Sequence, residues 1–218
     1  DWVRVDANLG VVEVIRKAID LKANFIIAHE PTFYNHLDDT GWLENDPVYR
    51  FKAALLKQHN IAVWWNHDYI HSLPTDGVRA GVVKQLGWEK FRSSNPSVFE
   101  MAPTSLRALI ADVKEKLGVL SVRYIGGLSD SCRKVLLMPG ASGGRNQITS
   151  IAREKPDVIV CGEIAEWKTA EYIRDARSKG DKLSLVVLGH VASEEPGSKF
   201  LAEWMTEKVK GVTTTHVP

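Results

Sequence analysis

The segment "NFIIAHEPTFYNH", residues 24–36, contains the strand around which the rest of the fold is predicted. Its four apolar residues, 25–28, suit a β-strand, and His29 and Glu30 follow directly. A strand that ends in an imidazole beside a carboxylate is either an ordinary start of a polar loop or one part of a metal site. The rest of the chain has to distinguish these two interpretations.

On both sides of this strand, helical and strand patterns alternate. Helices are predicted at 10–22, 47–59, 76–86, from Thr104 to Gly118, and at 145–154, 166–178 and 195–208. Strands are predicted at 61–65, 121–125, 134–138, 157–160 and 183–188 and in the final "VTTTHV", and a connector is predicted at 92–97. The alternation predicts an α/β protein with largely parallel sheets, in two similar layered halves, 1–95 and 96–218.

The composition of the chain limits its partners. With 218 residues, 44% hydrophobic and 25% charged, it has the balance of a soluble globular protein. A formal charge of +1 without a basic run argues against nucleic acid, and no stretch has the length of a membrane span. Cys132 and Cys161 stand alone, which favours buried free thiols and a reducing cytoplasm. The chain begins at Asp1 and not at a methionine, which leaves room for an upstream segment.

Polar side chains follow four of the predicted strands. Ligands of open α/β sheets bind outside the carboxyl ends of the strands, so these side chains are expected to meet in one cleft. A single histidine at a strand end is usually a hydrogen-bonded loop residue, whereas four such coincidences favour a metal or catalytic cluster. The candidates are His29, Glu30, His67, His71, Glu163, His190 and Glu194.

The chemistry of these candidates suits divalent Zn, Mn, Fe, Co or Ni, which imidazole and carboxylate bind well. The chain has neither a Gly-x-Ser-x-Gly elbow nor a GxxxxGK[ST] phosphate loop. The segment "PGASGG", 139–144, is either a flexible turn or an anion-binding loop. Four tryptophans lie near these motifs, Trp42, Trp64, Trp65 and Trp88. Two interpretations are open for them: packing in a core, or stacking of at least one of them on a planar substrate.

Three motifs resemble the Nif-three-like family, also called GTP cyclohydrolase 1 type 2 homologs. The family has an apolar strand that ends in His-His, a later strand followed by His-x₃-Asp, and a C-terminal Gly-His with Glu four residues after the His. The corresponding segments here are "FIIAHEPTF", "VWWNHDYIHSLPTDGV" and "VVLGHVASEEPG". Glu30 stands where the family has its second strand-end His, and His71 stands where it has the Asp.

The resemblance implies two α/β halves with two divalent metal ions in the cleft between them, and a homohexamer. It implies His29, Glu30, His71, His190 and Glu194 as ligands, and His67 is an additional or supporting one. Glu163 is expected near them to position a ligand or to transfer a proton. Two functions remain open. One is a metal-dependent hydrolase acting on a small nucleotide-like or pterin-like molecule, and the other is a non-catalytic metal-binding, regulatory or metal-delivery protein.

Overall fold

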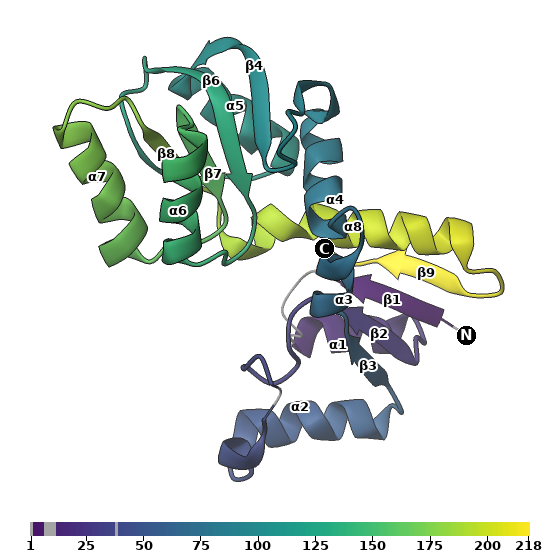
Figure 1. Ribbon diagram of the computed structural model, residues 1–218. Coiled ribbons are helices and arrows are strands. Elements are labelled where there is room, and N and C mark those ends of the chain that lie inside the picture. Colours follow the sequence, from purple (N-terminus) through teal and green to yellow (C-terminus); the bar gives the residue numbers. More distant parts are fainter. Residues whose placement is uncertain (1, 7–11, 38) are drawn as a thin grey trace. The chain divides into compact units, whose positions relative to one another are not determined.

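The computed structural model describes residues 2–6, 12–37 and 39–218. Its elements form two compact units (Figure 1). The first comprises Asp1–Gly81 and Glu195–Pro218, and the second comprises Val82–Glu194. The C-terminal segment belongs to the first unit because its strand pairs with the first strand of the chain. The halves 1–95 and 96–218 stay a prediction about the domains of the protein.

The first unit contains a four-stranded parallel sheet in the order β3-β2-β1-β9. Helices α4 and α8 continue into the second unit. The strands are β1 (Trp2–Asp6), β2 (Phe25–Ala28), β3 (Ala62–Trp65) and β9 (Thr213–His216). The helices are α1 (Val12–Asp20), η1 (Gly41–Leu43), α2 (Pro47–Gln58), α3 (His67–Ser72), α4 (Gly77–Leu86) and α8 (His190–Lys208).

Strand β2 is buried on both faces, which explains its continuous apolar sequence. Ile26 and Ala28 point into a cluster that also contains Ile15 of α1. Ile27 points to the opposite face, into a cluster that contains Ile70 of α3 and residues of α4 and α8. Helices on both sides therefore fix the position of β2 and of the residues that follow it.

The second unit contains a five-stranded sheet in the order β4-β6-β7-β8-β5. The three central strands are parallel, and the two edge strands are antiparallel to their neighbours. The strands are β4 (Val98–Ser105), β5 (Arg123–Ile125), β6 (Ser131–Met138), β7 (Val158–Cys161) and β8 (Ser184–Val187). The helices are η2 (Glu89–Phe91), α5 (Leu106–Leu117), α6 (Gly144–Glu154), the π-helix η3 (Glu166–Ala170) and α7 (Glu171–Ser178).

The central strands of the second unit are also covered on both faces. Val158 and Val160 of β7 face the cluster that includes α5. Ile159 of β7 faces the cluster that includes Ile151 of α6 and Ile173 of α7. Parallel strands buried in this way end together at one edge, where the following loops are brought side by side.

The mixed α/β class with parallel-rich sheets, predicted from the sequence, is confirmed. Three local predictions were wrong. No strand was predicted between the connector at 92–97 and the helix that was expected to start at Thr104, but strand β4 occupies Val98–Ser105. Helix α5 is capped by Ser105, whose Oγ accepts from the Ala108 N–H at 3.2 Å, and not by Thr104. The loop after β3 contains helix α3. For the first predicted helix, residues 10 and 11 lie outside the described ranges.

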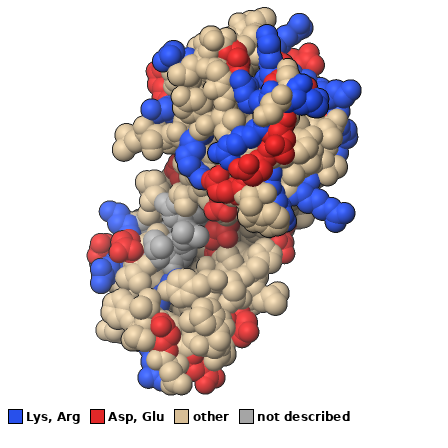
Figure 2. Space-filling model, turned by 90° about the vertical axis from the view of Figure 1, so that its left-hand side faces the viewer, with Lys and Arg blue, Asp and Glu red and all other residues tan. Residues whose placement is uncertain are grey.

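Basic and acidic side chains are intermingled on the face shown in Figure 2. This mixture agrees with the formal charge of +1. Within the described ranges, none of the helices combines the length and the apolar character needed to cross a membrane.

Candidate metal centre

Three histidines meet at the carboxyl edge of the first unit's sheet. His29 directly follows β2, and His67 begins α3 just after β3. Because β2 and β3 are parallel neighbours, both chain segments leave the sheet at the same edge, and the Asn66 N–H still donates to the Ala28 carbonyl at 2.9 Å. His71 lies one helical turn after His67, on the same side of α3.

The three imidazole rings are close enough to share one ion. The ring centroid of His29 lies 4.8 Å from that of His67 and 5.2 Å from that of His71, and the last two are 4.7 Å apart. One nitrogen from each ring lies within 4.8 Å of the other two. Two nitrogens on one zinc ion are at most about 4.2 Å apart, so small side-chain rotations would bring all three into bonding distance.

Carboxylates hold two of these rings in the orientation that a metal ligand needs. Nδ1 of His71 lies 3.0 Å from Oδ2 of Asp76, and Nδ1 of His67 lies 2.9 Å from Oδ1 of Asp68. An ionised carboxylate only accepts hydrogen bonds, so Nδ1 carries the proton and the lone pair of Nε2 is left to bind a cation. The pair of each histidine with its carboxylate therefore favours metal binding through Nε2.

The two carboxyl groups stay ionised to lower pH than usual. Burial acts to raise the pKa of Asp76, but the hydrogen bonds from His71 and from the Arg79 N–H outweigh it, and the pKa lies below its ordinary value. The hydrogen bond from His67 lowers the pKa of the exposed Asp68 carboxyl group. Both groups are thus suited to accept a hydrogen bond from imidazole over the whole neutral range.

Glu30 lies beside this three-histidine group. Its Oε1 is 3.9 Å from Nε2 of the buried His29. A carboxylate at this position adds an anionic oxygen to three neutral nitrogens, which lowers the cost of holding a dication.

The second unit brings its own candidates together. His190 is the first residue of α8, and its Nε2 lies 2.9 Å from Oε2 of Glu194, one turn later. Its Nδ1 lies 3.0 Å from Oε1 of Glu163, which follows β7. A neutral imidazole has a single N–H and can donate to one carboxylate only. A cation between Nε2 and Glu194 would satisfy both of them, while Glu163 accepts from Nδ1.

Close backbone packing supports the buried Glu194 carboxylate. Oγ of Ser193 accepts from the Gly140 N–H at 2.9 Å and donates to the His190 carbonyl at 2.7 Å. A Cβ on Gly140 would lie 1.9 Å from Oε1 of Glu194, and one on Gly162 would lie 2.3 Å from Oγ of Ser193. Both positions therefore need glycine. In the segment "PGASGG", Gly140 therefore lies against the Glu194 carboxylate.

The sequence reasoning missed several residues around these groups. Asp76 lies in the quoted motif, and an Asp just before the Gly77 start of a helix is a recognisable capping signal. Asp68 lies in the same motif, directly after His67, but its hydrogen bond with that histidine was not predicted. His36 and Ser193 had no such signal, because their contacts depend on tertiary packing. Of the four tryptophans, Trp88 is a core residue at 1% exposure, as the packing interpretation expects.

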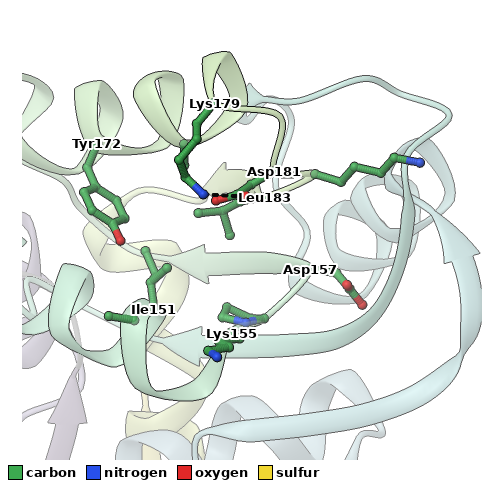
Figure 3. A pocket seen from close by; sticks show the side chains of 11 residues that line it. Ile151, Lys155, Asp157, Tyr172, Lys179, Asp181 and Leu183 are labelled. Carbon is green, nitrogen blue, oxygen red and sulfur yellow. Dashed lines mark hydrogen bonds and ion pairs between the residues drawn. The ribbon is translucent and has the colours of Figure 1, made fainter.

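A pocket of about 520 Å³ lies elsewhere in the second unit (Figure 3). Its walls include Lys155 and Asp157, before β7, and Asp181, before β8, so it lies at the amino ends of these strands. Glu163 and His190 follow the carboxyl ends of the same strands. Lys179 is paired with Asp181 at 2.8 Å, and Asp157 accepts two backbone N–H groups at 2.8 Å each. The pocket therefore lies at the opposite end of these strands from Glu163 and His190.

Comparison with known proteins identifies relatives that span most of the chain. A protein named "GTP cyclohydrolase 1 type 2 homolog" from Chlamydia pneumoniae is 25% identical over 99% of this chain and 82% of its own length. Its namesake from Pyrococcus abyssi is 28% identical over 98% of this chain and 81% of its own.

Among solved structures, the hypothetical protein SA1388 of Staphylococcus aureus has a similar fold, with a TM-score of 0.77 at 18% identity over 99% of this chain and 84% of that one. A Bacillus cereus protein related to NIF3 has a TM-score of 0.75 at 18% identity, over 100% of this chain and 86% of that one. The model of the family Duf34/NIF3 (NGG1p interacting factor 3) matches residues 4–217, and the chain therefore belongs to this family.

Proposed function

We propose that the protein binds two divalent metal ions and uses them to hydrolyse a small nucleotide-like or pterin-like substrate. The observation that carries the metal-binding part is the three-histidine group of His29, His67 and His71. In two of these histidines, His67 and His71, Nδ1 is paired with a carboxylate, which leaves Nε2 for a metal ion. The names of the relatives, GTP cyclohydrolase 1 type 2 homologs, support the substrate class.

The proposed ligands of the first unit are His29, Glu30 and His71, with His67 as an additional ligand, and the proposed ligands of the second unit are His190 and Glu194. Whether the two groups serve the same ions is a proposal, which a double-mutant cycle of His29→Gln and Glu194→Gln tests: strongly non-additive losses of metal support it, and additive losses contradict it. The ions could be Zn, Mn, Fe, Co or Ni, because imidazole and carboxylate suit all of them.

Each residue has a defined task in such a site. Bound divalent ions would polarise a substrate oxygen and make a water molecule easier to deprotonate. Asp76 and Asp68 keep Nε2 of His71 and His67 available by accepting from Nδ1. Glu163, 3.0 Å from Nδ1 of His190, orients that ring, and we propose that its exposed carboxylate also accepts the proton of the attacking water.

A second candidate function is a non-catalytic metal-binding, regulatory or metal-delivery protein. It is favoured by the exposed pair of His36 and Asp68 beside His67, which connects the histidine group to solvent. Elemental analysis of protein purified without added metal, followed by hydrolysis assays on nucleotide and pterin substrates, separates the candidates. Bound metal with turnover supports the hydrolase, and bound metal without turnover supports the second function. Protein that neither contains nor takes up metal contradicts both.

Glu30 and His71, which stand where the family has a His and an Asp, provide a sharper test of the ligand set. Glu30→His should reduce metal content, because it replaces an anionic ligand with a neutral one. The metal affinity should fall by roughly 10-fold or more. His71→Asp should shift the preference toward harder ions such as Mn. The double variant should recover more metal than Glu30→His alone. Strictly additive losses would show that the two positions do not share a site.

The cellular setting is also proposed. Cys132 and Cys161 are buried and free, which suits a reducing compartment such as the cytoplasm. We propose a homohexamer that takes small molecules and neither nucleic acid nor membranes as partners.

A further inference from the structure

Next to the three-histidine group lies a second cluster of possible ligands, made by His36, His67 and Asp68. One ligand atom of each lies within 4.8 Å of the other two. Oδ1 of Asp68 is 2.9 Å from Nδ1 of His67 and 3.9 Å from Nε2 of His36. Two imidazoles and one carboxylate that leave positions open are a common donor set for divalent zinc or iron.

The ring of His36 is oriented by two aromatic neighbours. It stands edge-on to Trp65, at a centroid distance of 4.8 Å and an interplanar angle of 87°, and edge-on to His67 at 5.2 Å and 88°. Trp65 ends β3 and His67 begins α3, so both neighbours belong to rigid elements. His36 is therefore held with Nε2 toward Asp68, although its loop lies at the surface.

Exposure falls step by step from this cluster to the three-histidine group. The side chain of Asp68 is 80% exposed and that of His36 is 61% exposed. His67, which belongs to both clusters, is 26% exposed, and His29 is 3% exposed. A hydrated cation can reach the outer pair directly, whereas reaching His29 requires the loss of most of its water.

We propose that His36, Asp68 and Nδ1 of His67 form a second, solvent-facing divalent-cation site, through which ions enter the three-histidine group. This inference rests on the proposed metal binding of that group. A cation at the outer site replaces the proton on Nδ1 of His67, and this proton leaves to solvent. His67 is then an imidazolate, which binds the outer ion through Nδ1 and keeps the lone pair of Nε2 for the inner group. The ion is then already in contact with a residue of the inner group, and its remaining water is replaced in stages.

The test uses the full-length protein stripped of metal, with Zn²⁺ as the probe for calorimetry and Co²⁺ for stopped-flow absorbance. The test variant is His36→Gln, which removes an exposed ligand. The matched control is His59→Gln, at an exposed histidine of the first unit that directly follows α2. Asp68→Asn is a second test variant.

In the wild type we expect one weaker zinc equivalent in addition to the tight binding. His36→Gln should lose the weaker equivalent and take up Co²⁺ roughly 10-fold more slowly, a loss typical of removing a supporting group, with the tight affinity unchanged. Asp68→Asn should do the same and also weaken tight binding, because Asp68 orients His67. His59→Gln should match the wild type.

Three results would overturn the proposal. The His36→Gln variant keeps the weaker zinc equivalent, or it takes up Co²⁺ at the wild-type rate. The third is that His59→Gln slows Co²⁺ uptake as much as His36→Gln does. In each of these cases tight binding by the wild type leaves the proposed function standing. A wild type without tight metal binding would instead contradict the proposed function itself, and with it this inference.

Discussion

Asp76→Asn tests whether a carboxylate sets the metal-binding form of His71. Asp76 makes two hydrogen bonds: Oδ1 accepts from the Arg79 N–H at 3.0 Å and caps α4, and Oδ2 lies 3.0 Å from Nδ1 of His71. Oδ2 also lies 3.6 Å from the Arg79 guanidinium. An amide has only one oxygen. If this oxygen keeps the cap, the amide N–H₂ faces Nδ1, donates to it and moves the imidazole proton to Nε2, the atom needed by the metal.

The expected loss of metal affinity follows from the general effect of the hydrogen-bond partners of metal-binding histidines. Loss of the partner of a metal-binding histidine weakens metal affinity by roughly 10- to 100-fold, which corresponds to about 1.4–2.7 kcal/mol. If the amide turns its oxygen to His71 instead, α4 loses its cap, and the metal-free protein loses about 1 kcal/mol of stability. One of the two losses must appear.

The assay combines zinc calorimetry with thermal unfolding of the metal-free protein. The control is Asp112→Asn, which removes an exposed carboxylate paired with Lys116 on α5 and should change neither quantity by more than about 0.5 kcal/mol. If Asp76→Asn binds zinc with wild-type affinity and also unfolds at the wild-type temperature, the reasoning about the tautomer and the cap is refuted.

Further predictions concern the second unit. Gly140→Ala should destabilise the protein more than Gly118→Ala in urea unfolding. Both glycines have similar positive φ, +64° and +67°, and a left-handed conformation costs alanine about 1–2 kcal/mol. Only Gly140 lies against Glu194, since nothing lies within 4 Å of a Cβ at Gly118; equal losses would contradict that contact. Burial raises the pKa of Cys161 to about 12 and, with nearby carboxylates, that of Cys132 to about 11. Since the unfolded thiols ionise near 9.0, stability should fall as pH rises from there toward 11. Iodoacetamide should label both thiols after unfolding, and rapid labelling of the native protein would show that they are not buried.

The parts of the fold that could be predicted are those with strong local patterns. Strand β2 and the central strands of the second unit are buried on both faces, and their continuous apolar runs are visible in the sequence. Strand β4 was missed because it is an edge strand with exposed residues and contains Pro103, which is typical of edges. Helix α3 was missed because it is short and polar.

The same distinction holds for the candidate site. His29, His67 and His71 could be identified because each follows a strand end, and parallel pairing brings such ends together. The pairing of Asp76 with Nδ1 of His71 could not be predicted, although Asp76 carries a capping signal, since its position depends on how α4 packs after α3. The exposure of His36, which decides its role, likewise depends on tertiary packing around Trp65.

The central claim is that His29, His67 and His71 together hold a divalent metal ion. X-ray absorption spectroscopy of the zinc-loaded protein tests it most directly, since it reports the atoms bound to the metal. We predict imidazole nitrogens at about 2.0–2.1 Å, with the nitrogen contribution reduced in His29→Gln. A zinc environment of oxygen atoms alone, or one that His29→Gln leaves unchanged, would contradict the account.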